Sequence, residues 1–198
     1  MIKLKLSELS LKGQQQFALF SMARVKNLYN LFVEEIQQDQ LVELSAYENG
    51  LKLLTDMHDA LRKSFPDFNN DEIVKSVETS YSLAIQDHVY SSFQSTIATQ
   101  IALLHVSALE FLKTKNADVM EDVLIYIEEI INIVESEMFF RANPDGSYDE
   151  SESIILERIK SDRLKQLEVL KQIDEAVDLD LDSLVKGNEL LFIDPDQA

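Results

Sequence analysis

The sequence predicts an all-α, single-domain bundle of about six or seven helices around a buried central helix. Three observations support this prediction: apolar residues recur every three to four positions over long stretches, no alternating strand pattern appears, and glycine and proline are scarce. The 198 residues include only 4 Gly and 3 Pro, and most of them stand where a helical period ends or restarts. An apolar content of 45% is enough for a folded core.

The first predicted helix runs from about Gln14 to Gln38 and carries a broad, aromatic-rich apolar face. A second helix is expected over Leu41–Phe65, because apolar residues keep helical spacing until Pro66 interrupts the pattern. Asn70 or Asp71 is then expected to cap a third, shorter helix, since their side chains can accept a hydrogen bond from a free backbone N–H.

The central helix is predicted over Val89–Leu109, which has 21 consecutive residues without a formal charge. That length approaches what is needed to cross a bilayer. Nine of these residues are Ser, Thr, Gln or His, which is too many for a segment facing lipid. We therefore expect a buried helix in which His105 is hydrogen-bonded inside the core, and we expect His88 to begin it.

Two long helices are predicted in the second half of the chain. The first is "NADVMEDVLIYIEEIINIVESEMFF", capped by Asn116, and it ends at "NPDGS". The second runs from about Tyr148 to Ala176 and carries the densest basic cluster, which we expect to be mostly a solvated face with weak intrahelical pairs. Residues 1–177 are predicted to be one all-helical domain. The acidic segment 178–198 is predicted to be a tail that packs on this domain through Leu190, Leu191 and Phe192.

The segment "DGSYDESESIILE" places oxygen-bearing side chains at alternating positions from Asp145, as a calcium-binding EF-hand loop does. Its sixth position, where the loop needs glycine, is Glu150, and its twelfth, where a bidentate glutamate belongs, is Leu156. We therefore predict an acidic loop that caps the following helix.

The charge is strongly negative and unevenly distributed. There are 36 acidic and 18 basic residues, for a net charge of −18. Residues 1–38 hold five bases and three acids, a balance of +2, so the rest of the chain carries −20. Such a surface repels nucleic acid and anionic membranes and attracts basic proteins. We expect no nucleic-acid or membrane partner; the alternative explanation of the charge is solubility alone.

Several kinds of chemistry have no support in the sequence. The absence of cysteine excludes disulfides, thiolate metal sites and cysteine nucleophiles. Glycine-rich phosphate loops and the G-x-S-x-G nucleophile motif do not occur. None of the three histidines, His58, His88 and His105, has the Glu-x-x-His spacing of di-metal bundles. We therefore expect no catalytic residues, no metal and no cofactor.

Two segments, "QQFALFSMARVKNLYNLFVEE" and "VYSSFQSTIATQIALLHVSALEFL", carry a resemblance. Together with the long last helix and short hydrophobic tail, they resemble the YjaG-like bacterial family, catalogued as domain of unknown function 416. The resemblance covers most of the chain. It implies an all-helical bacterial protein of unassigned activity, with a suggested genomic association with signalling histidine kinases, and it brings no catalytic residues. The chain departs from the family in "NPDGSYDESES" and in "KGNELLFIDPD".

The leading functional hypothesis is a non-enzymatic, acidic protein-interaction module that neutralises a basic protein partner, as an immunity protein does. The alternatives are a regulatory or signalling protein associated with histidine kinases, which could act as a homodimer, and a metal-assisted hydrolase built on His58, His88 and carboxylates. The start "MIKLKLSELS" lacks the features of a secretory signal, so a cytoplasmic location is expected. The candidate partner-binding residues are Asp118, Glu121, Asp122, Glu128, Glu129 and Glu135.

Overall fold

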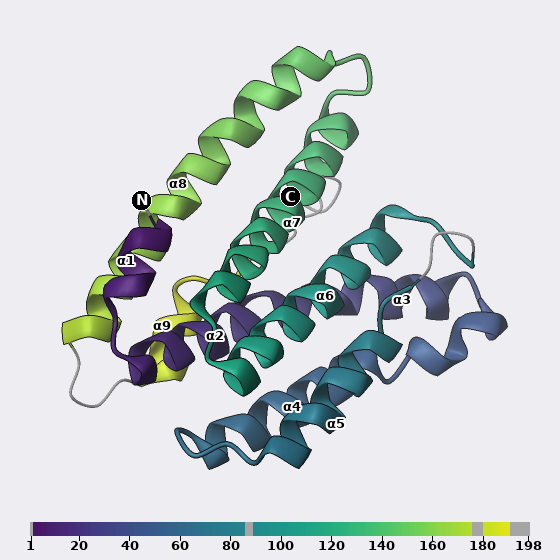
Figure 1. The fold of residues 1–198 in the computed structure, drawn as a ribbon. Coiled ribbons are helices and arrows are strands. Elements are labelled where there is room, and N and C mark those ends of the chain that lie inside the picture. The colour runs from purple at the N-terminus through teal and green to yellow at the C-terminus, as the bar shows by residue number, and fades with distance from the viewer. Residues whose placement is uncertain (1, 86–88, 176–179, 191–198) are drawn as a thin grey trace.

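The computed structural model describes residues 2–85, 89–175 and 180–190, and over these residues the protein is an all-α single domain (Figure 1). The predicted fold class is therefore confirmed. Six of the described helices have 13 residues or more, and three are shorter. The α-helices are α1 (Ile2–Glu8), α2 (Leu11–Val25), α3 (Asn30–Gln38), α4 (Gly50–Ser64), α5 (Asn70–Ser82), α6 (Phe93–Thr114), α7 (Met120–Ala142), α8 (Tyr148–Glu175) and α9 (Leu181–Lys186), and the 3₁₀ helices are η1 (Lys26–Tyr29), η2 (Val42–Tyr47) and η3 (Ala117–Val119).

Helix α6 is the buried central helix, and it packs against α2, α3, α5 and α7. By length and composition it could cross a membrane, but 72% of its most apolar stretch is buried inside the protein. It begins at a reciprocal capping pair: Ser95 N–H donates to Ser92 Oγ at 2.9 Å, and Ser92 N–H donates to Ser95 Oγ at 2.7 Å. The predicted start at His88 lies outside the described residues.

The prediction of one continuous helix over residues 14–38 is wrong in one respect, because the 3₁₀ helix η1 separates α2 from α3. The tighter turn accompanies the burial of Tyr29, whose hydroxyl donates to the Leu83 carbonyl at 3.3 Å. Gly50 lies directly under this ring: a Cβ built on it would be 2.2 Å from Tyr29 Cε1. A tertiary contact thus interrupts a segment whose apolar period runs on without a visible break.

Two further boundaries and one additional helix differ from the prediction. The segment expected to be helical from Leu41 begins with η2, and α4 starts only at Gly50. The cap of α5 is Asn69, whose side chain accepts from Asp71 N–H at 2.9 Å, so the predicted cap is one or two residues late. Helix α1 was not predicted; it packs against α8 with Ile2, Leu6 and Leu9 buried.

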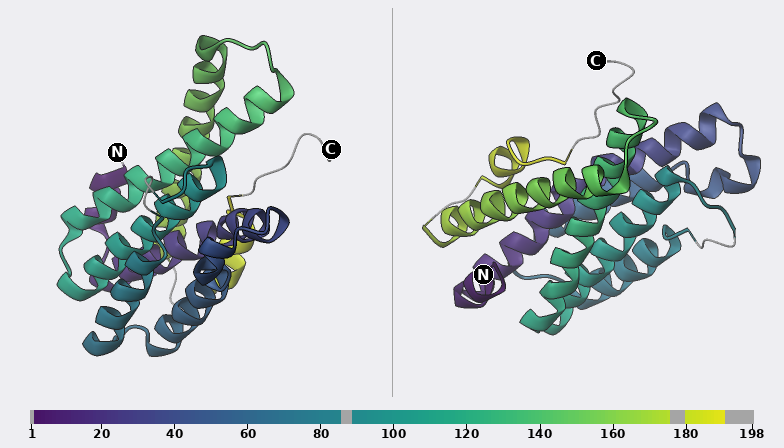
Figure 2. Two further views of the ribbon diagram at one scale, coloured as in Figure 1. Left: turned by 90° about the vertical axis from the view of Figure 1, so that its right-hand side faces the viewer. Right: turned by 90° about the horizontal axis from the view of Figure 1, so that it is seen from above.

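Helices α7 and α8 form an antiparallel hairpin that extends beyond the other helices (Figures 1 and 2). Before α7, Asn116 caps η3 by accepting from Asp118 N–H at 3.1 Å. The loop before α8 is an acidic capping loop, as predicted: Ser147 N–H donates to Glu150 Oε2 at 3.0 Å, and Glu150 N–H donates to Ser147 Oγ at 3.3 Å. The Ser147 backbone N–H and its hydroxyl, which donates to Glu150 Oε2 at 3.1 Å, lower the pKa of Glu150.

The C-terminal part of the described chain packs on α2 through α9. Leu181, Leu184 and Val185 are buried, and Leu190 N–H donates to the Arg24 carbonyl at 3.0 Å. Leu190 itself is buried. Leu191 and Phe192, which were predicted to pack with it, lie outside the described residues.

Candidate functional site

The six predicted partner-binding acids lie in two rows along η3 and α7. The outer row consists of Asp118, Asp122 and Glu129, which are exposed, with Ile125 between them at 53% exposure. With Ile125 included, successive members of this set are four, three and four residues apart, and this spacing places them on one face of a helix. We call this set the acidic row.

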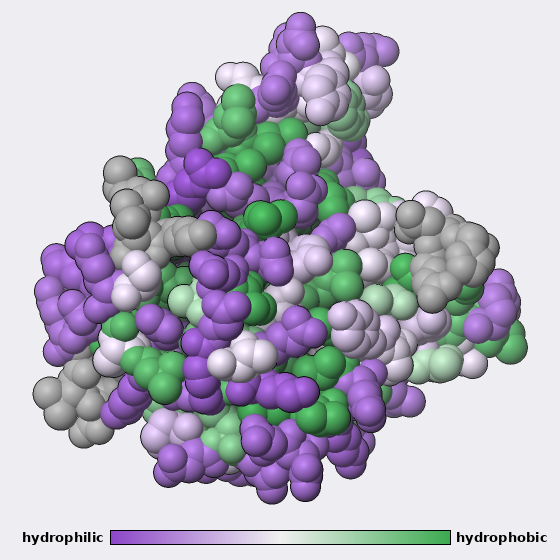
Figure 3. Space-filling model, in the orientation of Figure 1, coloured by the Kyte–Doolittle hydropathy of each residue, from purple (hydrophilic) through white to green (hydrophobic). Residues whose placement is uncertain are grey.

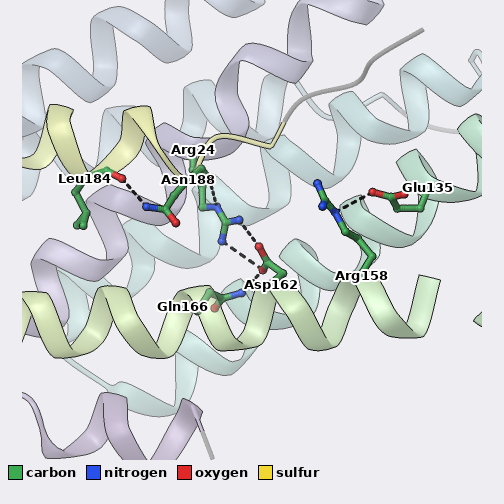
Figure 4. A network of polar contacts seen from close by, with 7 residues as sticks. All are labelled: Arg24, Glu135, Arg158, Asp162, Gln166, Leu184 and Asn188. Carbon is green, nitrogen blue, oxygen red and sulfur yellow. Dashed lines mark hydrogen bonds and ion pairs between the residues drawn. The ribbon is translucent and has the colours of Figure 1, made fainter. Parts of the chain in front are cut away.

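The other three acids repeat every seven residues and lie on the flank of α7 next to α8. Arg163 of α8 binds Glu128 through Nε at 2.6 Å and Nη2 at 2.9 Å. Arg158 Nε lies 3.0 Å from Glu135 Oε1 (Figure 4). Glu121 is half-buried. Because Glu128 and Glu135 are paired with arginines of α8, a partner would have to compete with these ion pairs for them.

These pairs also correct the prediction for the basic cluster of α8. Arg158 and Arg163 remain substantially exposed, but their carboxylate partners come from α7 and not from their own helix. The antiparallel packing of α7 against α8 brings together residues 23 and 35 positions apart in the sequence, and sequence spacing within one helix cannot show such pairs.

Tyr126 on α7 lies near Asp122 and is influenced electrostatically by Tyr81 of α5. Burial is the main cause that raises the pKa of Tyr126, and the nearby groups of Asp122 and Tyr81 raise it further. Tyr81 of α5 is exposed and Tyr126 of α7 is half-buried. The surface around Asp122 therefore includes an aromatic side chain, that of the half-buried Tyr126.

Two of the histidines lie inside the core. His58 Nε2 is 3.2 Å from the Leu19 carbonyl, and His105 Nδ1 is 2.8 Å from the Ile101 carbonyl. Burial lowers the pKa of each imidazole to about 4, so both are neutral at pH 7.

The carboxylates of the hydrolase hypothesis do not gather around these histidines. Asp59 Oδ1 is 3.9 Å from His58 Nδ1, too far for a hydrogen bond. Across the ranges described above, no three His, Asp or Glu side chains form a group that could hold a metal ion. His88 lies outside these ranges.

A buried polar network was missed by the sequence analysis (Figure 4). The guanidinium of Arg24, 2% exposed, donates to the two oxygens of Asp162 at 2.5 and 3.4 Å and to the Asn188 carbonyl at 3.1 Å. Gln166 Nε2 donates to Asp162 at 2.6 Å. The network joins α2, α8 and the segment after α9, and its place in the core makes it structural.

One signal in the sequence could have indicated this network. Asp162 and Gln166 are polar residues at the helical spacing of the buried face of α8, between Ile155 and Val169. A carboxylate at such a position requires a cationic or hydrogen-bonding partner. The sequence does not reveal that this partner is Arg24.

The structure defines a class of protein: an all-helical bundle whose candidate site is an acidic, partly aromatic face. The sequence matches no protein-family model and no curated protein. The fold is similar to that of a DUF416 family protein from Shewanella baltica, known from its crystal structure, with a TM-score of 0.66 over 94% of this chain and 90% of that chain. The two sequences are 16% identical. The resemblance drawn from the sequence is thus confirmed at the level of the fold.

Proposed function

We propose that the protein is a non-enzymatic interaction module and that the acidic row along η3 and α7 binds a basic protein. The observation that carries this proposal is the exposed Ile125 set between the exposed carboxylates of Asp122 and Glu129. An apolar centre surrounded by charged groups is the usual composition of a protein interface. Tyr81 and Tyr126 add aromatic side chains, which are enriched at such interfaces.

The charge of the whole chain supports a basic partner. A net charge of −18 attracts cationic surfaces over distances of about a Debye length, roughly 8 Å at physiological salt, and raises the association rate. A stable complex buries about 1,200–2,000 Å² in total, roughly half of it on each partner, which is more than the four side chains of the acidic row offer. The partner is therefore expected to cover the surface around Tyr81 as well as the acidic row.

Binding of this kind would neutralise the partner. A basic surface that acts on an anionic target cannot reach that target while carboxylates cover it. The buried positions of His58 and His105 support a role without catalysis, because neither imidazole faces solvent.

Affinity capture from the native host at low salt tests the proposal. The bait is the protein itself, compared with the charge reversal D122K/E129K and with E43K/E48K, a matched reversal of two exposed glutamates on and beside η2. We expect a basic protein, identified by mass spectrometry, that is retained by the protein and by E43K/E48K and is lost by D122K/E129K.

Three outcomes would contradict the proposal: no protein retained, an acidic protein retained, or equal retention by both reversals. Capture of a sensor histidine kinase that depends on the same residues would favour the signalling alternative.

A further inference from the structure

The outer face of α8 has an exposed apolar side chain above a hollow surface. Leu164 is 68% exposed, whereas Asp162 and Gln166 on the opposite face are buried. A groove of about 540 Å³ lies on one side of it, lined by Ile2, Leu124 and Leu167 among others. A second groove of about 460 Å³, between α1 and α8, is also lined by Leu164 and Leu167. Figure 3 shows hydrophobic surface over the α7–α8 hairpin among hydrophilic residues.

Charged residues on this face are arranged symmetrically around Leu164. Lys160 and Glu168 stand four residues before and after it, and Glu157 and Lys171 stand seven residues before and after it. All four are exposed. Positions four and seven residues apart share one face of an α-helix, so these side chains flank Leu164 along one stripe. The two members of each symmetric pair have opposite charges.

We propose that this stripe is the interface of a homodimer in which α8 of one copy packs antiparallel to α8 of a second copy, about a twofold axis at Leu164. In a twofold interface, if residue i contacts residue j, then j also contacts i. The axis therefore places Lys160 against Glu168 of the second copy and Glu157 against Lys171 of the second copy. Each Leu164 meets its counterpart beside the grooves of the other copy.

Charge complementarity selects this arrangement over others. A parallel pairing of the two helices would place lysine against lysine and glutamate against glutamate, which is repulsive. Two copies with a charge of −18 each also repel one another over most of their surfaces. Residues 155–172 hold five bases and three acids, a balance of +2, so the two surfaces that meet in this dimer lack the strong negative charge of the rest of each copy.

The apolar groups and the charges have different roles in this dimer. Exposed ion pairs each add little affinity, so the leucines and the grooves supply most of it, while the charges fix the antiparallel orientation. The inference does not depend on the proposed function, since the acidic row and the stripe on α8 are separate faces.

Sedimentation velocity over a broad concentration series tests the dimer. We expect a concentration-dependent dimer for the protein and a monomer for Leu164→Asp. Lys160→Glu should weaken association by about tenfold, because each dimer then contains two like-charge contacts. The double reversal K160E/E168K should restore association, since opposite charges again face one another. Ile125→Asp, a matched apolar-to-acid change on the acidic row, should leave the dimer intact while abolishing partner capture.

The proposal is overturned if the protein stays monomeric at all concentrations, if Leu164→Asp still dimerises, or if K160E/E168K associates no better than Lys160→Glu. The substituted side chains are exposed, so circular dichroism and thermal melting should show native folding for every variant. The charge reversal and its rescue decide the matter even if Leu164→Asp is misfolded.

Discussion

The buried ion pair between Arg24 and Asp162 provides the sharpest test of the described packing. In Asp162→Asn the side chain keeps its size but loses its charge, which leaves the guanidinium of Arg24 buried without a counter-ion. Removing one partner of a buried pair typically costs about 3–5 kcal/mol in the free energy of unfolding. The Phe20 ring, 5.5 Å from the guanidinium carbon, and the Asn188 carbonyl offset only part of that loss.

A double-mutant cycle separates the pair from other effects. Arg24→Met keeps an unbranched apolar stem and leaves Asp162 with the hydrogen bond from Gln166. We expect a similar loss of about 3–5 kcal/mol for this variant. The double variant R24M/D162N contains no buried charge at this place, so it should be more stable than the sum of the two losses predicts, by about 1–3 kcal/mol.

Urea unfolding followed by circular dichroism at pH 7 measures these free energies. Asp182→Asn is the matched control, because Asp182 forms a bidentate pair with Arg62 at 2.5 and 2.9 Å on the protein surface. Its loss should cost no more than about 1 kcal/mol. The reasoning is refuted if Asp162→Asn costs no more than Asp182→Asn, or if the losses in the cycle simply add.

Two further predictions concern stability. The pKa of His58 and His105 is lowered to about 4 in the native state against 6.5 in the unfolded chain, so their neutral forms contribute full stability above pH 6.5 that is lost as the pH falls towards 4. Urea unfolding should show a loss of about 2 kcal/mol for each imidazole by pH 5, and a flat profile from pH 6.5 to 5 would be the contrary result. Gly50→Ala should cost about 1–3 kcal/mol or more in the same assay, because the added Cβ overlaps the buried ring of Tyr29. Gly187→Ala, whose Cβ meets nothing within 4 Å, should change stability by no more than about 0.5 kcal/mol, and equal effects of the two substitutions would contradict the packing.

The long helices could be predicted from the sequence because their signals are local. Helices α6, α7 and α8 have continuous apolar periods and nearby polar residues that stabilise their starts, and their observed bounds lie within a few residues of the expected ones. The break at η1 could not be predicted in the same way. It accompanies contacts of Tyr29 with Gly50 and Leu83, which lie 21 and 54 residues further along the chain.

The candidate site was predictable in part for the same reason. The acids of α7 are visible in the sequence, but only the packing of α8 shows that Glu128 and Glu135 are paired and that Asp122 and Glu129 face solvent. Likewise Arg24 and its partner are 138 residues apart, so their pairing depends on tertiary structure.

Site-specific photocrosslinking in the native host tests the proposed function most directly. A photoreactive amino acid replaces Ile125, and the crosslinked species are isolated and identified by mass spectrometry. We predict one main covalent product with a basic protein, which disappears when D122K/E129K is added to the same chain. A product formed with acidic proteins only, or no product beyond that formed at an unrelated exposed position such as Val42, would contradict the claim that this face binds a basic partner.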